Sequence, residues 1–295
     1  MRTKERDIPY CGVRYKVIKK ANPVLNEQNT AHLMQFIIDR YGIYYAKDVL
    51  KLPAPWTKNP ILSTYKFTNI FRENDRVSKA LIKNVSKNKG LSLEDKVANT
   101  FLFRSWNNPY TFTDFGGPWS AEDIYNGLKL KETVRPLYKA IIDVDPDRKW
   151  FSVAYNQGST KSMWKYPDGK THANNDKGAE SDIPLRIFHI GPWLKKNNVY
   201  ERVMNAQSQK EVYDIIQELP SFAYFLSYQV FVDLTYIKDF PFSENEFTIA
   251  GPGCKRGLSY VFEDTDGMTP EECLFWLRDN MNCLLYTSPS PRDCS

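Results

Sequence analysis

Residues 53–76 carry the densest signal of this chain; they read PAPWTKNPILSTYKFTNIFRENDR. Pro55 and Pro60 fix their own φ angles and restrict the residues before them, so this backbone is pre-set. From Ile61 onward, the spacing of apolar positions predicts a helix that meets a core; these positions are Ile61, Leu62, Tyr65, Ile70 and Phe71. We therefore expect a proline-rich corner that leads into a packed helix.

The same segment ends in a polar run that contains Asn69, Arg72, Glu73, Asn74, Asp75 and Arg76. A structural interpretation pairs the two arginines with Glu73 and Asp75 as ion pairs at the corner. A functional interpretation presents the arginines to an anionic ligand. The residues alone favour neither interpretation over the other.

The pattern P-W-T-x-x-P-I-L-x-x-Y-x-F-T-N-x-F-R-E-x-D-R resembles the helical domain of phage 5-hydroxymethyl-deoxyuridine DNA kinases. That domain is similar to the α-glutamyl/putrescinyl thymine pyrophosphorylases, enzymes of thymine hypermodification in viral DNA. The resemblance implies a mainly α fold: a helical bundle like that of DNA glycosylases, with a helix-hairpin-helix motif. It also implies a bacteriophage origin and a role in DNA modification.

Length and composition fit a folded globule with a mild positive charge. The chain has 295 residues, 42% of them hydrophobic and 14% aromatic, and a formal net charge of +5. This charge permits a nucleic-acid surface without requiring one. The sequence has neither an apolar run long enough for a bilayer nor a signal peptide at its N-terminus. We therefore expect no membrane association and a cytoplasmic protein of a virus-infected or host cell.

The C-terminus reads differently from the rest of the chain. Residues 283–293, CLLYTSPSPRD, look like translated sequencing adapter, the mark of a metagenomic fragment. We expect residues 1–282 to form one helical domain that can divide into two lobes, at about residues 26–145 and 184–282. Residues 283–295 are then an artefactual tail.

Helices are expected along most of the chain. Asn29 or Thr30 can cap a helix that ends near Gly42, and Ser92 with Asp95 forms a capping box for a helix over residues 93–106. Further helices are expected at residues 43–50, 120–128, 134–142, 184–195 and 206–218, and one after Arg76 that ends in the link VSKNKG at residues 85–90. Arg104 lies on an otherwise apolar helix and must find an acceptor, more plausibly a structural partner than a ligand phosphate.

The helical pattern breaks near residues 150–182, where we expect a short strand and a polar loop. Tyr155 belongs to a V-A-Y-N element that resembles one of the family. The lysines of this loop could contact a nucleic-acid backbone, but an ordinary solvated loop explains them as well.

Residues 219–236 predict a helix end, a tight turn at residues 220–222 and an apolar helix. This resembles the hairpin motif of base-excision glycosylases, which presents backbone N–H groups to a DNA phosphate. Here Ser221, Phe222 and Ala223 stand where that motif carries glycines. Asp233 on the second helix requires a partner or a function, and Tyr228 and Gln229 lie about one turn before it.

The sequence GPGCKRG at residues 251–257 predicts a glycine turn at a helix start, an arrangement that suits an anion. Gly251 and Gly253 form the turn, and Arg256 follows on the helix. The motif is weak alone and gains weight from the resemblance, since the same segment follows the apolar helix there.

Several catalytic signatures are absent from the sequence. It contains no GxxxxGK[ST], so it is not by itself a P-loop kinase, and three scattered histidines do not suggest a zinc site. We expect no cofactor and no metal. A P-loop kinase domain or protein is the expected protein partner.

The leading hypothesis is a DNA-binding, base-recognition domain that acts on 5-hydroxymethyluracil in DNA. An alternative is a pyrophosphorylase-like transferase, in which an amine or amino acid displaces (pyro)phosphate from the phosphorylated base; a non-catalytic scaffold is the third. If the chain is an enzyme, its catalytic residues are expected to be Asp233, Arg72 and Asp75. The residues expected to contact substrate or DNA are Trp56, Asn69, Arg76, Arg104, Tyr155, Tyr228, Gln229, Gly251, Gly253 and Arg256.

Overall fold

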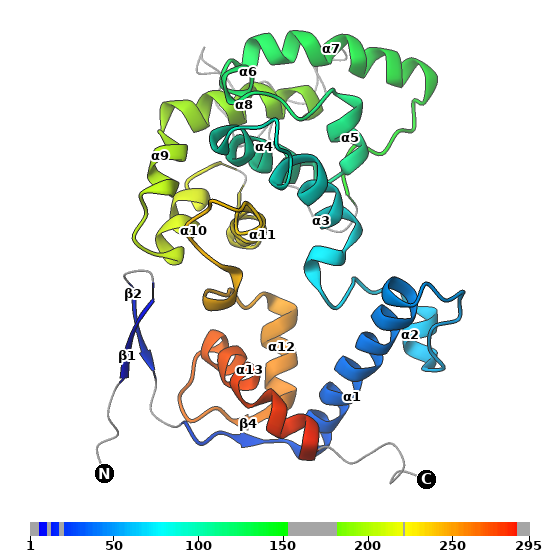
Figure 1. Cartoon of the computed structure of the whole chain (residues 1–295), viewed down its shortest axis with the longest axis vertical. Helices are drawn as coiled ribbons and strands as arrows, with labels where there is room; N and C mark the ends of the chain where they lie inside the picture. The colour runs from blue at the N-terminus through cyan, green and yellow to red at the C-terminus, as the bar shows by residue number, and fades with distance from the viewer. Residues whose placement is uncertain (1–5, 11–12, 18–20, 153–181, 221, 288–295) are drawn as a thin grey trace. The chain divides into compact units, whose positions relative to one another are not determined.

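The computed structural model describes the backbone of residues 6–10, 13–17, 21–152, 182–220 and 222–287. The chain is mainly α-helical, as expected (Figure 1). It folds into two compact units. We call Met1–Pro9, Arg14–Asp75 and Thr248–Ser295 the terminal unit, and Tyr10–Val13 with Arg76–Phe247 the central unit.

The terminal unit is built on two long helices, α1 (Glu27–Tyr44) and α13 (Pro270–Thr287). A third helix, α12 (Pro252–Val261), packs against both of them. Its core contains Leu258, Val261, Phe262, Met268, Cys273 and Leu277. The strands β3 (Val24–Leu25) and β4 (Phe262–Asp264) pair antiparallel beside this core. A second two-stranded sheet joins β1 (Arg6–Tyr10) to β2 (Val13–Val17).

Helix α1 is longer than the sequence indicated. It begins after Asn26, whose side chain accepts a hydrogen bond from the Asn29 N–H group, so neither Asn29 nor Thr30 is the cap. Gly42 lies within the helix, which continues into the π-helical turn η1 (Tyr45–Val49). The two helices expected on either side of Gly42 are therefore one continuous element.

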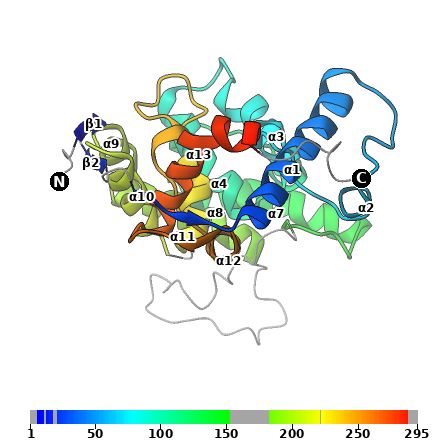
Figure 2. The same ribbon diagram turned by 90° about the horizontal axis from the view of Figure 1, so that it is seen from below.

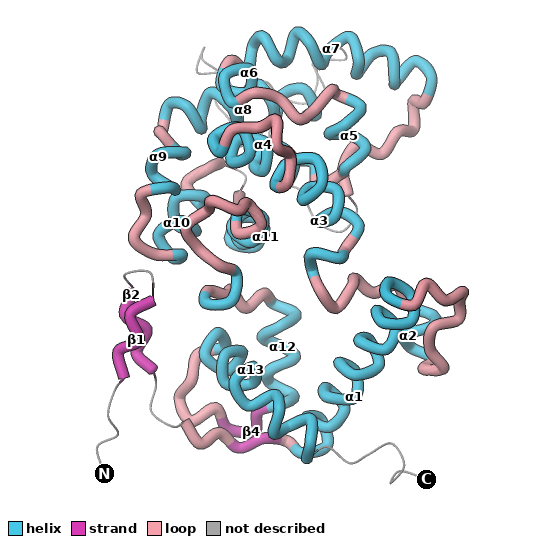
Figure 3. The backbone as a smooth tube through the Cα atoms, viewed as in Figure 1, coloured by secondary structure: helices cyan, strands magenta, loops and turns pink. Residues whose placement is uncertain are grey.

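The expectation for residues 61–71 was largely wrong. Only α2 (Pro60–Thr64) is helical, and the chain then runs irregularly to the 3₁₀ turn η2 (Arg72–Asn74), as Figure 3 shows. Leu62 is buried, whereas Ile61 is 58% and Tyr65 67% exposed. Most of these apolar side chains thus lie at the surface of the terminal unit. Figures 1 and 2 show α2 and its neighbouring loops at the end of α1 that lies away from α13.

The central unit is organised around α4 (Leu93–Trp106), on which every residue from Val97 to Trp106 is buried. The expected capping box is present: Ser92 Oγ accepts from the Asp95 N–H, and Asp95 accepts from the Ser92 N–H. Around α4 lie α3 (Arg76–Leu81), η3 (Ile82–Ser86), α5 (Pro109–Asp114), α6 (Ala121–Tyr125), α8 (Asp182–Lys196), α9 (Val199–Met204) and α11 (Tyr224–Leu234).

The division of the chain differs from the expected lobes. Helix α7 (Gly127–Val144) lies at the end of the first expected lobe, and α8 lies at the start of the second. The two helices nevertheless pack along each other. The two units instead divide at residues 75/76 and 247/248. The end of the first expected lobe, near residue 145, and the start of the second, near residue 184, therefore both lie within the central unit. The segment 153–181, with the expected strand, the loop lysines and Tyr155, lies outside the described residues.

Helices α10 (Gln209–Gln217) and α11 form the helical hairpin expected at residues 206–236. The Phe222 N–H donates to the Leu219 carbonyl at 3.0 Å, and Ser227 Oγ donates to the Phe222 carbonyl at 3.0 Å. Phe222 itself is 3% exposed and packs against Phe101 of α4. A buried phenylalanine that packs on α4 therefore stands at the position after the turn where the glycosylase motif carries a glycine.

In the described part of the chain, no helix is long and apolar enough to cross a membrane. Helix α13 continues past Asn282 to Thr287, into the residues expected to be an artefactual tail.

Candidate functional site

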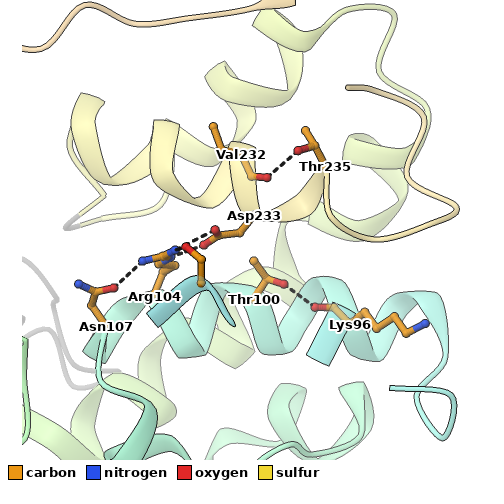
Figure 4. Close-up of polar contacts among 8 residues, drawn as sticks. Lys96, Thr100, Arg104, Asn107, Val232, Asp233 and Thr235 are labelled. Atoms are coloured by element: carbon orange, nitrogen blue, oxygen red, sulfur yellow. Dashed lines mark hydrogen bonds and ion pairs between the residues drawn. The ribbon is translucent and has the colours of Figure 1, made fainter. Parts of the chain in front are cut away.

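A buried ion pair joins helices α4 and α11 of the central unit. Arg104 of α4 donates from Nε to Oδ2 of Asp233 on α11, and from Nη2 to Oδ1 at 2.8 Å (Figure 4). The two side chains are 2% and 0% exposed. Arg104 and Asp233, each of which was expected to need a partner, are therefore partners of each other.

Two neutral side chains also contact the guanidinium. Arg104 Nη1 donates to Asn107 Oδ1 at 2.6 Å, and Nη2 lies 3.4 Å from Ser78 Oγ on α3. Asn107 occupies the left-handed region, with φ 51°, at the C-terminal cap of α4. Asparagine tolerates this conformation better than most residues, so the turn that ends α4 also aims an amide oxygen at Arg104.

This arrangement determines what Asp233 can do chemically. Both of its oxygens accept hydrogen bonds from Arg104, and its side chain is fully buried. Removing one partner of such a pair leaves an uncompensated buried charge, which costs about 3–5 kcal/mol. Asp233 thus holds α11 against α4.

The three other expected residues that the structure describes in the central unit differ in exposure. Gln229 is 5% exposed, and Tyr228 is half-buried with its hydroxyl 3.5 Å from the Phe247 carbonyl oxygen. Arg76 is exposed at the first position of α3. Of these three, Arg76 is the residue best exposed to meet a ligand.

In the terminal unit, Trp56 and Asn69 are both fixed by hydrogen bonds. Trp56 Nε1 donates to the Leu52 carbonyl at 2.8 Å, and its ring lies under Lys47 Nζ at 5.0 Å. Asn69 Nδ2 donates to Asp48 Oδ2 at 2.8 Å, and its Oδ1 accepts from the Phe71 N–H at 2.9 Å. Asn69 therefore ties the irregular segment after α2 to η1.

Arg72 and Asp75 bracket the turn η2, and both are half-buried. The Asp75 N–H donates to the Arg72 carbonyl at 3.0 Å, which closes the turn. The two residues are close in sequence and belong to the terminal unit, as a shared role in one site would require.

The glycine turn at residues 251–253 precedes a helix, as expected, although α12 begins at Pro252 and not near Lys255. Gly251 is the N-terminal cap and provides no side-chain hydrogen bond. Gly253 and Arg256 are exposed, and a Cβ at Gly253 would meet no atom within 4 Å. The neighbouring Ala250 N–H is already occupied, since it donates to Glu271 Oε1 at 2.9 Å.

The expected residues thus fall into two groups. Arg104 and Asp233 meet directly in the central unit, which also contains Arg76, Tyr228 and Gln229. The terminal unit contains Trp56, Asn69, Arg72, Asp75, Gly251, Gly253 and Arg256. Among the described residues, no cluster of histidine, cysteine, aspartate or glutamate could hold a metal ion.

Sequence reasoning missed the polar partners of these residues: Asn107 and Ser78 beside Arg104, and Asp48 beside Asn69. Asn107 had a readable signal, because an asparagine after the last apolar turn of a helix and before Asn-Pro suits a helix cap. Ser78 and Asp48 carry no comparable local signal.

Burial changes the titration of three side chains in the terminal unit. Desolvation lowers the pKa of Arg40, and burial together with a nearby glutamate raises the pKa of the Cys254 and Cys273 thiols. The two thiols are therefore protonated at neutral pH, which argues against a nucleophilic role.

The family model described as "5-hmdU DNA kinase, helical domain" matches residues 27–286. The 5-hmdU DNA kinase of Bacillus phage SP10 is 29% identical over 254 residues, which are 82% of this chain and 37% of that relative. The chain thus spans little more than a third of the relative's length. No solved structure matches.

The structure defines a mainly helical domain whose central unit is closed by a buried ion pair. The match extends from the start of α1 to the end of α13. The chain belongs to the family of 5-hmdU DNA kinase helical domains, as its sequence motif suggested.

Proposed function

We propose that this chain is the DNA-recognition domain of a viral system that modifies 5-hydroxymethyluracil in DNA. The observation that carries the proposal is the family match over residues 27–286, together with a relative named 5-hmdU DNA kinase. A domain of this kind brings the modified base to an enzyme that acts on it, inside the virus-infected cell.

The exposed groups of the terminal unit support DNA as the ligand. The uncapped start of α12 offers backbone N–H groups, and the exposed Arg256 follows one turn later. Backbone amides and an arginine suit a DNA phosphate, while Trp56, Asn69, Arg72 and Asp75 suit contacts to a base. In the central unit we assign DNA contact to Arg76, Tyr228 and Gln229, of which Arg76 is the most exposed.

The state of Asp233 favours recognition over catalysis. In a transferase, Asp233 would orient an incoming amine, yet both its oxygens accept hydrogen bonds from Arg104 and no part of its side chain is exposed. We therefore give Arg104 and Asp233 a positioning role. The phosphoryl transfer named in the relative would require a P-loop kinase domain or protein, which we propose as the partner.

The test is binding of the whole chain to a duplex that contains hydroxymethyluracil and to the matched thymine duplex, by fluorescence anisotropy at two salt concentrations. We expect tighter binding of the modified duplex at both concentrations. Equal affinities with a steep salt dependence would contradict base recognition and leave only phosphate contacts.

Arg256→Ala should weaken binding of both duplexes and lower the salt slope by about 1, because one phosphate contact is lost. The matched control is Arg202→Ala. Arg202 is also partly exposed, but it is paired with Glu218 in the central unit and is not assigned to DNA.

A further inference from the structure

An unusual number of aromatic rings lie exposed on one part of the terminal unit. They come from the second half of α1, from η1 and from the segment up to η2. We call them the aromatic platform: Tyr41 (48% exposed), Tyr45 (45%), Trp56 (36%), Tyr65 (67%), Phe67 (42%) and Phe71 (38%). Large exposed apolar patches of this kind mark interaction sites.

Contacts between the rings hold several of them in a row. The Tyr41 and Tyr45 rings are nearly parallel, with centroids 6.4 Å apart and an interplanar angle of 19°. Phe71 meets Tyr44 edge-on at 4.8 Å and Tyr41 at 6.2 Å. Tyr41, Tyr45 and Phe71 therefore form an ordered part of the platform, in which rings from α1, from η1 and from the later segment lie side by side.

Polar side chains fix the irregular segment of the platform to α1 and η1. Asn59 Nδ2 donates to Asp39 Oδ2 at 3.0 Å, and Arg40 Nη2 donates to the Thr68 carbonyl at 2.7 Å. The Asn69–Asp48 hydrogen bond adds a third tie. A surface fixed in this way loses little conformational freedom when it binds a ligand.

The charges around the rings favour an anionic ligand. Residues 36–71 contain five basic residues, namely Arg40, Lys47, Lys51, Lys58 and Lys66, and two acidic ones, Asp39 and Asp48. All four lysines are exposed. Both carboxylates accept hydrogen bonds from asparagine side chains within the segment. The difference, 5 − 2, leaves a net charge of +3 beside the rings.

We propose that the aromatic platform binds an unpaired DNA strand, with bases stacked on the rings and phosphates near the lysines. Exposed rings interleaved with cations are the surface that single strands use, since every base offers a stacking face. In a duplex those faces are hidden inside the helix. The proposal rests on DNA being the ligand of this domain, and it adds which form of DNA is bound.

Exposed aliphatic side chains also border the platform, among them Leu50, Leu52 and Ile61. A protein partner would use these side chains and would have no need of the surrounding lysines. The interleaved charges therefore favour a nucleic acid, and the experiment separates the two.

The test uses a fluorescent thymine-containing single strand and the duplex formed with its complement, neither of which contains hydroxymethyluracil. The whole chain should bind the single strand more tightly. Tyr65→Ala should weaken this binding about tenfold, the loss of one stacked base, and Tyr65→Phe should keep it because the ring remains. Tyr110→Ala is the matched control, since Tyr110 is 56% exposed and belongs to the central unit.

Equal or tighter binding of the duplex would overturn the proposal. So would a Tyr65→Ala chain that binds the single strand as tightly as the unsubstituted one. A chain that binds neither DNA would also overturn it and leave the platform to a protein partner. Because no modified base is present, these outcomes are independent of whether the chain distinguishes hydroxymethyluracil from thymine.

Discussion

Arg104 and Asp233 lie 129 residues apart in the sequence and form a two-point ion pair that water does not reach. Together with Asn107 and Ser78, the guanidinium links α3, α4 and α11. The hairpin of α10 and α11 is thus fastened to the central helix of its unit by one charged contact.

Substitution of Asp233 by alanine should lower the free energy of unfolding by about 3–5 kcal/mol, since Arg104 would remain buried without its counter-charge. Urea unfolding followed by tryptophan fluorescence measures the change. Glu218→Ala is the control, because it removes an exposed partner of Arg202, worth at most about 1 kcal/mol.

The double variant Arg104→Met, Asp233→Leu tests the same pair differently. Apolar side chains of similar size remove both buried charges, so stability should recover well above that of Asp233→Ala. A double variant as unstable as the alanine variant would show that the loss arises from packing and not from the unpaired charge.

The capping box of α4 supports a second prediction. Ser92→Ala should cost about 1 kcal/mol, because one helical N–H group loses its acceptor. Asp95→Ala should cost more, since Asp95 also accepts from the Ala121 N–H at 2.5 Å. Thermal unfolding measures both. Ser259→Ala, at an exposed position of α12, should change stability by less than about 0.5 kcal/mol.

Two helical glycines should respond to alanine in opposite directions. A Cβ at Gly191 of α8 would lie 1.7 Å from the Ile124 carbonyl oxygen, so Gly191→Ala must push α8 from α6 and should destabilise by about 1–3 kcal/mol or more. Gly42 of α1 has open space around it, and Gly42→Ala should stabilise by about 0.5–1 kcal/mol. A melting temperature that Gly191→Ala leaves unchanged or raises would contradict the packing of α8 on α6, and one that Gly42→Ala lowers would contradict the open space at Gly42.

Cysteine reactivity provides a fourth prediction. Burial raises the pKa of Cys254 and Cys273, whereas Cys283 is exposed. At pH 8, iodoacetamide should therefore modify Cys283 faster than the other two, because the thiolate is the reactive form. Mass spectrometry of the digested protein resolves each site. Cys273 reacting as fast as Cys283 would show that the core of the terminal unit opens readily.

Local chemistry made much of the helical pattern predictable. Ser92 with Asp95 marked the start of α4, Ser120 marked that of α6, and the glycine turn preceded α12. Each signal depends on atoms a few residues apart. The helix expected after Ile61 was a wrong prediction, because most of its apolar side chains are exposed and have no core to pack against. Helices α6 and α7 are separated at Asn126, whose side chain caps α7. The apolar pattern of the sequence does not show this cap.

The sequence by itself determined the helical class, the capping box of α4, the family and the fact that Arg104 and Asp233 each needed a partner. Only the tertiary structure decided that each is the other's partner, and that Arg72, Asp75 and Arg256 belong to a different compact unit. It also decided that the rings of residues 41–71 lie at the surface of their unit. The reason is physical: caps and periodicity act within one or two turns of the chain, whereas a buried charge is satisfied by whichever distant side chain the packing of helices brings into contact.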